Sequence, residues 1–282
     1  MSHILLSLET SGTRCGVALL QGEGSGASIM FDHQDGTQQH AERLLPMVTG
    51  LLAQAGLTQS DISAVAFGQG PGGFTGLRVA CAVAQGMAMA LGISVVPIGS
   101  LDAIAHEVAR RDHPVVVAVA MDARMGEAYA ALFLLEPGHA PVPGQLRADA
   151  AAPIVIQPPV LLAGADLAAW LREAERHAQA PLAELKGGMN LCSWVLAGDG
   201  WAVHAGAQAP VDPWEIDPID RPTAQAVARL GAQAFIEGKA IDAAQAQPLY
   251  VRDKVAFTTA ERAGGLGGNP KASSRVGAGG EP

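Results

Sequence analysis

Aromatic residues are scarce in this sequence: six phenylalanines, four tryptophans and two tyrosines make up only 4% of its 282 residues. Any core must therefore be built mainly from aliphatic and small side chains, and 49% hydrophobic residues with 34 glycines meet that requirement. This length is enough for one large domain or two lobes without disulfides or structural metals. The composition favours a layered α/β fold.

Cysteines and paired metal ligands are also few. Cys15, Cys81 and Cys192 lie far apart in the sequence, which argues against a disulfide framework or a Cys-x-x-Cys zinc site. None of the eight histidines stands three or four residues from another, so the ligand pair of a helical metal site is missing. A Gly-x-Ser-x-Gly nucleophile motif is absent as well. We therefore predict no metal site and no catalytic residue.

Long apolar runs, a secretory signal and excess positive charge are missing too. The longest apolar stretches, residues 79–91 and 115–121, are shorter than the roughly 18 residues that a membrane span needs. No basic region followed by an apolar stretch stands at the N-terminus, and we expect a cytoplasmic protein with no membrane contact. A formal net charge of -9 argues against tight, independent binding to a phosphate backbone, so tRNA or other nucleic acid would be held through a partner.

The first part of the chain contains short strand patterns followed by helical ones. Residues 4–8, 16–20 and 28–31, separated by Gly/Ser-rich turns, predict an antiparallel meander. Further strands are predicted at 62–67 and 95–98. Apolar periodicity predicts helices at 40–55, at 75–91, and at 100–111 with Ser100 as N-cap. Because Pro46 would remove a backbone hydrogen bond from the first of these, we expect a kink there or a later helix start.

The second part repeats this organisation. Strands are predicted at 114–121, 127–135, 160–163 and 194–197. Residues 6–19 and 119–131 share one pattern of strand, acidic residue, tight turn and returning strand, which predicts two ribonuclease-H-like lobes. With a boundary near Asp112, the lobes would span residues 1–112 and 113–257. Residues 258–282 are Gly-rich with almost nothing apolar, and we expect a disordered tail.

Two small-residue turns are candidates for holding a phosphate group through backbone N–H groups. The residues concerned are Thr10, Ser11, Gly12, Gly70, Gly72 and Gly73. Each turn also has a structural interpretation: the first as an ordinary hairpin, and the second as a tight strand-to-helix connection with Phe74 in the core. The motifs of P-loop and Rossmann nucleotide sites are not matched.

The helices at 40–55 and 75–91 are candidates for a protein interface. In the second, Gly76, Ala80, Ala84 and Ala88 recur every four residues, a spacing that lets another helix approach closely. Burial within the helix's own lobe explains the same pattern. The candidate interface residues are Leu44, Met47, Val48, Leu51, Leu77, Ala80, Ala84 and Met87.

Five segments taken together resemble the TsaB (YeaZ) family in order and spacing over roughly residues 1–257. They are LETS at 8–11, HAERLLPM at 40–47, GPGGFTGLR at 70–78, MDARMGEAY at 121–129 and PLYVR at 248–252. The chain differs from the common family pattern at Glu9, where Asp is usual, and at Gly73, where Ser is usual.

The resemblance implies an actin-like, sugar-kinase-like fold of two ribonuclease-H-like lobes with mixed sheets flanked by helices. It implies a noncatalytic subunit that pairs with the catalytic subunit TsaD and the ATPase TsaE, with tRNA bound only through the complex. That complex transfers a threonylcarbamoyl group to the adenosine next to the anticodon in tRNAs that read codons beginning with adenine. This chain would need no cofactor of its own, since ATP or ADP and a metal belong to the partner subunits.

Alternatives to this accessory role remain open at this point. The chain could be a stand-alone ATPase or a sugar-kinase-like phosphotransferase that uses the two turns, or, less in keeping with its residues, a peptidase. An apolar helix pair would also allow the chain to form a homodimer when its partner is absent.

Overall fold

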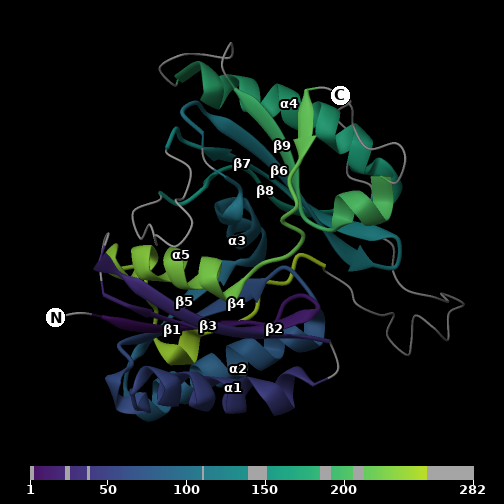
Figure 1. Ribbon diagram of the computed structural model, residues 1–282. Helices are drawn as coiled ribbons and strands as arrows, with labels where there is room; N and C mark the ends of the chain where they lie inside the picture. The colour runs from purple at the N-terminus through teal and green to yellow at the C-terminus, as the bar shows by residue number, and fades with distance from the viewer. Residues whose placement is uncertain are drawn as a thin grey trace, which may run out of the picture.

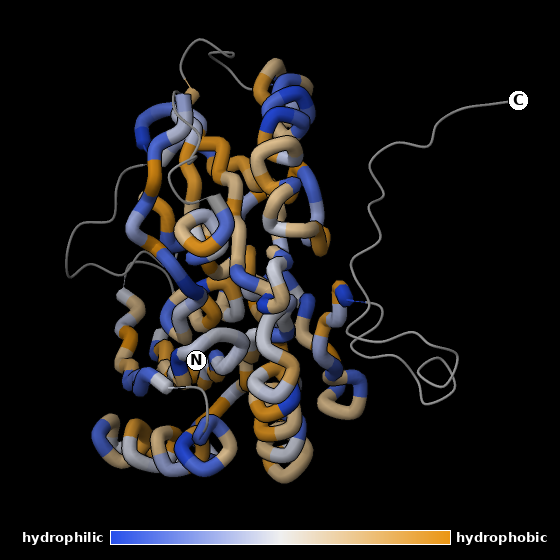
Figure 2. Tube along the Cα trace, turned by 90° about the vertical axis from the view of Figure 1, so that its right-hand side faces the viewer, coloured by the Kyte–Doolittle hydropathy of each residue, from blue (hydrophilic) through white to orange (hydrophobic). Residues whose placement is uncertain are grey.

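The fold is that of a computed structural model, in which residues 3–22, 26–36, 39–109, 111–138, 151–184, 192–205 and 213–252 are described. The predicted tail, residues 258–282, lies outside the described residues. Hydrophobic residues concentrate on the strands inside the molecule (Figure 2), as expected for a core of aliphatic side chains.

The first sheet has the order β3-β2-β1-β4-β5. Its strands are β1 (Ile4–Glu9), β2 (Arg14–Gln21), β3 (Ser28–Asp35), β4 (Ala64–Gly70) and β5 (Ser94–Gly99). The pairs β1/β2 and β2/β3 are antiparallel, whereas β1/β4 and β4/β5 are parallel. The predicted antiparallel meander is confirmed.

The second sheet repeats the first. Its strands are β6 (Val115–Arg124), β7 (Glu127–Leu135), β8 (Ile154–Ala163), β9 (Ser193–Ala197) and β10 (Trp214–Ile216), in the order β10-β9-β6-β7-β8. In the opposite direction the order is β8-β7-β6-β9-β10, which matches β3-β2-β1-β4-β5 of the first sheet. The pairs β8/β7 and β7/β6 are antiparallel and the pairs β6/β9 and β9/β10 are parallel, as in the first sheet. The duplicated, two-lobed actin-like α/β architecture predicted from the sequence is therefore confirmed.

In the described part of the chain, the helices α1 to α5 cover the two sheets in layers (Figure 1). α1 (His40–Ala55) and α2 (Phe74–Leu91) pack on the outer face of the first sheet, and α4 (Leu167–Glu184) packs on the outer face of the second. α3 (Ser100–Glu107) and α5 (Ala224–Ile236) lie between the sheets. Although we expected residues 113–257 to form the second lobe, α5 packs on the first sheet. The boundary near Asp112 stays a prediction.

Two helices differ from their predicted form. α1 begins at His40 and runs unbroken through Pro46 to its left-handed C-cap at Gly56. Pro46 is on the exposed side, where water can satisfy the carbonyl group that lacks its donor. α3 ends at Glu107 instead of residue 111, and its N-cap is Gly99, because Ser100 is already buried inside the first turn.

α2 is, within the described part of the chain, the one helix long and apolar enough to cross a membrane by length and composition. Its buried residues pack into the core beneath the first sheet. The helix is therefore accounted for as a core helix of the first lobe.

Candidate functional site

The turn between β1 and β2 is held against α2 by hydrogen bonds within the chain. The Thr10 hydroxyl donates to the carbonyl oxygen of Gly76 at 2.7 Å, and the Ser11 N–H donates to the Glu9 carboxylate at 2.5 Å. Burial raises the pKa of Glu9, and hydrogen bonds from Ser11 oppose the rise. A phosphate group at this turn would have to compete with Glu9 for the Ser11 donor.

The glycine-rich loop before α2 follows the same turn closely. A Cβ atom at Gly76 would overlap the carbonyl oxygen of Thr10, and one at Gly72 would lie 2.6 Å from the carbonyl oxygen of Ser11. The Gly73 N–H donates to that same Ser11 oxygen at 2.6 Å. These glycines are thus explained by close backbone approach.

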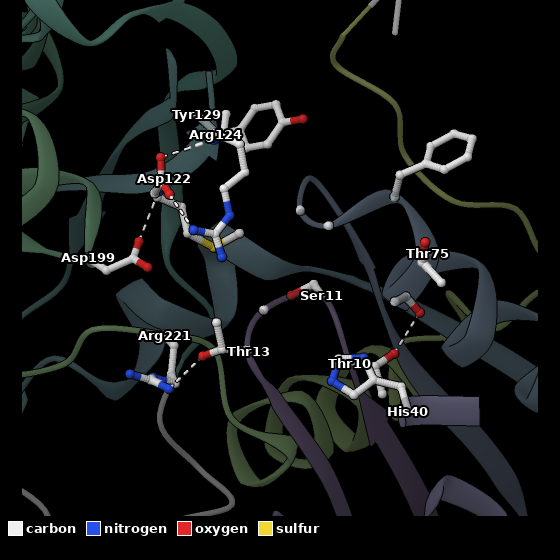
Figure 3. Close-up of a pocket in the computed structure, with 17 residues that line it drawn as sticks. Thr10, Ser11, Thr13, His40, Thr75, Asp122, Arg124, Tyr129, Asp199 and Arg221 are labelled. Atoms are coloured by element: carbon white, nitrogen blue, oxygen red, sulfur yellow. Dashed lines mark hydrogen bonds and ion pairs between the residues drawn. The ribbon is translucent and has the colours of Figure 1, made fainter. Parts of the chain in front are cut away.

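A cavity of about 350 Å³ opens between the two lobes, next to both turns (Figure 3). Five of the six candidate phosphate-loop residues line it, whereas Gly70 does not. Instead, Gly70 lies beneath Leu249 and Leu77, with a positive φ of 114°. The lining residues are Thr10, Ser11, Gly12, Thr13, His40, Gly72, Gly73, Phe74, Thr75, Gly76, Met121, Asp122, Ala123, Arg124, Tyr129, Asp199 and Arg221.

The second lobe contributes a charged wall centred on Asp122. This carboxylate pairs with His204 Nε2 at 3.1 Å and with Arg124 at 3.2 Å. The Asp122 N–H donates to Asp199 at 2.9 Å, and burial raises the pKa of Asp199. The charge of Asp122 is therefore offset by Arg124, and burial disfavours the charged form of Asp199.

Arg221 joins the two lobes at the edge of the cavity. Its guanidinium donates to the Thr13 hydroxyl at 2.7 Å and forms an ion pair with Asp220 at 2.5 Å. Ser11, His40 and Asp122 all border the cavity, but no hydrogen bond joins these three side chains, and Asp122 binds His204 instead. A serine-nucleophile triad is therefore not assembled here.

The sequence identified only some of these residues. His40, Asp122 and Arg124 fall in the family-like segments, whereas Asp199 and Arg221 were not singled out. Asp199 stands between two glycines, Gly198 and Gly200, whose Cβ atoms would run into the backbone of Ala120; this Gly-Asp-Gly pattern was an available signal. Among the described residues, no group of three or more potential metal ligands comes together.

The predicted interface residues are part of the core. Leu44, Met47, Val48, Leu51, Leu77, Ala80 and Ala84 are each at most 5% exposed in the single chain, and Met87 is half-buried against the same core. For the seven buried residues the prediction of a partner surface is wrong, because they face the first sheet; for Met87 it stays a prediction. Both helices expose their opposite sides, which carry Leu45, Pro46, Thr49 and Ala53 on α1 and Ala82, Gly86, Met89 and Ala90 on α2.

Two matched lobes with a cavity between them define an actin-like α/β protein. The family model described as TsaD, tRNA N6-adenosine threonylcarbamoyltransferase, matches residues 34–260. The Escherichia coli K12 tRNA threonylcarbamoyladenosine biosynthesis protein TsaB is 27% identical over 255 residues, covering 90% of this chain and 96% of that one. Its Haemophilus influenzae namesake is 40% identical over 126 residues, or 44% of this chain and 51% of that one.

A solved structure of YeaZ from Pseudomonas aeruginosa agrees with this chain in both sequence and fold. It is 30% identical with a TM-score of 0.65, and the match covers 88% of this chain and 99% of that one. The chain belongs to the TsaB (YeaZ) family.

Proposed function

We propose that this chain is a noncatalytic subunit for the synthesis of threonylcarbamoyladenosine in tRNA and that it forms a heterodimer with a TsaD-type catalytic subunit. The names of its relatives support the pathway. The match of residues 34–260 to the TsaD family model supports a partner of the same fold. The observation that carries the proposal is the exposed face of α1 and α2, defined by the eight outward-facing residues named above.

On α2 this exposed face carries a row of small residues. Ala82, Gly86 and Ala90 recur every four residues and are all exposed. A second helix can approach such a row closely, because no long side chain keeps the two backbones apart. Met89, 63% exposed, lies beside the row and offers a flexible apolar contact.

On α1 the exposed residues Leu45, Pro46, Thr49 and Ala53 are also uncharged, and the acidic Glu42 lies exposed in the first turn of the helix. Leu45, Thr49 and Ala53 follow one another every four residues, and Leu45 is 47% exposed. Contiguous apolar surface on two neighbouring helices is typical of a protein interface. α1 and α2 lie side by side below the first sheet (Figure 1) and can therefore contribute to one interface.

In this proposal the chain holds the TsaD cleft in its active arrangement, and the transfer to the adenosine beside the anticodon takes place in TsaD. The substrates are tRNAs that read codons beginning with adenine. TsaE supplies the ATPase, and the net charge of -9 supports contact with tRNA through the complex instead of through this chain. The complex acts in the cytoplasm, and without TsaD the same exposed face serves homodimer formation.

The test is binding to TsaD, measured by calorimetry and by size-exclusion chromatography with light scattering. Met89→Arg places a charge in the middle of the exposed face and should weaken binding by at least about tenfold, or roughly 1.4 kcal/mol. Ile236→Arg is the matched control, because Ile236 is 64% exposed at the end of α5, away from this face. Equal binding by both variants, or no binding by the wild type, would contradict the proposal.

The alternative of a stand-alone ATPase or sugar-kinase-like phosphotransferase gains one observation: both predicted turns do border the cavity. The Thr10 hydroxyl and the backbone N–H groups of Ser11 and Gly73 are, however, engaged by the chain itself. ATP turnover by the purified chain alone would favour this alternative over an accessory role.

A further inference from the structure

His40 is a buried polar side chain at the floor of the cavity between the lobes. It is 5% exposed, and its Nε2 atom has no hydrogen-bond partner among the described residues. Burial lowers the pKa of His40, against a smaller opposing effect of the Gly36 carbonyl group. A buried nitrogen without a partner is energetically unfavourable, so such a group calls for a ligand or an ordered water.

The start of α2 adds unpaired donors beside this ring. Backbone N–H groups of Phe74, Thr75 and Gly76 belong to the first turn, where an α-helix offers no internal acceptor. No side chain caps this helix, and these three N–H groups have no hydrogen-bond acceptor among the described residues. The His40 Nδ1 atom lies 3.3 Å from the position that a Cβ atom of Gly76 would take, so the ring and the helix start are adjacent.

On the opposite wall, the charged side chains are mostly paired within the chain. Asp122 is paired with Arg124, and burial raises the pKa of Asp199. Arg221 lines the edge of the cavity and is paired with Asp220. Figure 3 shows the residues that line this wall across the cavity from Ser11, Thr75 and His40. The unpaired donors at the helix start and the buried histidine beside them together suit an anion.

We propose that this cavity binds a small organic anion, whose carboxylate or phosphate group lies at the start of α2 and accepts a hydrogen bond from His40 Nε2. The volume of about 350 Å³ leaves room for a small organic body next to the anionic group. The site is separate from the exposed face of α1 and α2. The proposal of an anion site can therefore be tested independently of TsaD binding. Its donors are His40 and the first turn of α2, which directly follows the glycine-rich turn predicted from the sequence. The other predicted turn, between β1 and β2, supplies no donor in this proposal.

The test uses the full chain titrated with inorganic phosphate and, separately, with acetate, at constant ionic strength set with chloride. NMR follows the His40 side-chain nitrogens and the Thr75 and Gly76 amides. We expect saturable shifts at all three residues. A response to phosphate alone assigns a phosphate ligand, and a response to acetate extends the ligand to carboxylates. No saturable shift at these residues with either anion overturns the proposal.

A variant pair supplies the control. His40→Ala should weaken binding of the responding anion at least tenfold, whereas His33→Ala, which changes an exposed histidine on β3 of the same lobe, should leave the affinity unchanged. Unchanged affinity in a folded His40→Ala chain also overturns the proposal. If His40→Ala does not fold, the presence or absence of saturable shifts at Thr75 and Gly76 in the wild type decides whether the proposal holds.

Discussion

The guanidinium of Arg252 lies 2.5 Å from the carboxylate of Glu127, and the two side chains are 11% and 7% exposed. Arg252 also donates to the carbonyl oxygen of Ala123 at 3.0 Å, so it is anchored to the β6–β7 hairpin of the second lobe. Two residues earlier, the hydroxyl of Tyr250 accepts from Arg78 on α2 of the first lobe at 2.8 Å. Residues 248–252, which we call the strap, therefore connect the two lobes.

Arg252→Ala should destabilise the protein by about 3 kcal/mol or more, because it leaves the Glu127 carboxylate buried without its cation. Arg14→Ala is the matched control. It breaks the ion pair with Asp35, in which the two side chains are 27% and 63% exposed, and it should cost under about 1 kcal/mol. Urea unfolding measures both changes, and equal losses would show that the strap does not stabilise the lobes.

Gly76→Ala should destabilise the junction between α2 and the β1–β2 turn, because the new Cβ atom would overlap the Thr10 carbonyl oxygen. We expect a loss of at least about 1–3 kcal/mol, the usual cost of overpacking. Gly86→Ala on the same helix meets nothing within 4 Å and should instead stabilise by about 0.5–1 kcal/mol. Thermal unfolding of the two variants should move in opposite directions, and a shift in the same direction would contradict this packing.

Leu51→Arg and Leu45→Arg separate the core face of α1 from its exposed face. Leu51 is 2% exposed, so a charge there should prevent stable folding, whereas Leu45 is 47% exposed and its variant should fold normally. Leu45→Arg should lose TsaD binding. Circular dichroism and binding measurements distinguish the two effects. A folded Leu51→Arg chain that only loses binding would restore the original assignment of Leu51 to the interface.

Glu9→Gln should make the protein more stable at neutral pH. Burial raises the folded-state pKa of Glu9 above its ordinary value of 4.5, so the folded chain holds this proton more tightly than the unfolded chain. Stability due to Glu9 is therefore full below pH 4.5 and falls as the pH rises towards the folded pKa. Glutamine keeps the oxygen that accepts from the Ser11 N–H but never carries the buried charge.

Chemical denaturation at a series of pH values tests this effect. The advantage of Glu9→Gln should shrink as the pH is lowered towards 4.5. Glu42→Gln, on the exposed side of α1, should show no comparable trend. A Glu9→Gln variant that is less stable than the wild type at pH 7 would mean that the carboxylate is needed in its charged form.

The small residues of α2 show how far sequence reasoning reaches. Their four-residue spacing was correctly recognised, but the row Gly76, Ala80, Ala84 and Ala88 faces the first sheet, and the exposed row is Ala82, Gly86 and Ala90. Because α2 is apolar on nearly all sides, periodicity could not say which row faces the core. The sheet order decides this, since α2 must cover the outer face of β1 and β4.

For the cavity, the sequence predicted some of the lining residues and missed others. Its first-lobe turns were visible as small-residue segments, and the repeated pattern at residues 6–19 and 119–131 predicted the matching sheets. Arg221, by contrast, reaches the cavity only because α5 returns to the first sheet and brings the preceding loop with it. Asp199 follows β9 and reaches the cavity because β9 pairs with β6 in the second sheet. Such long-range contacts leave no local periodicity in the sequence.

In the proposed role, this chain supports a catalytic partner without carrying out the transfer itself. Threonylcarbamoyl transfer to tRNA should be measured with the cognate TsaD and TsaE subunits and threonylcarbamoyl-adenylate, with and without this chain. We predict transfer only when wild-type chain is added, little transfer with Met89→Arg, and none with the chain alone. Equal transfer with and without the chain would contradict the proposed accessory role.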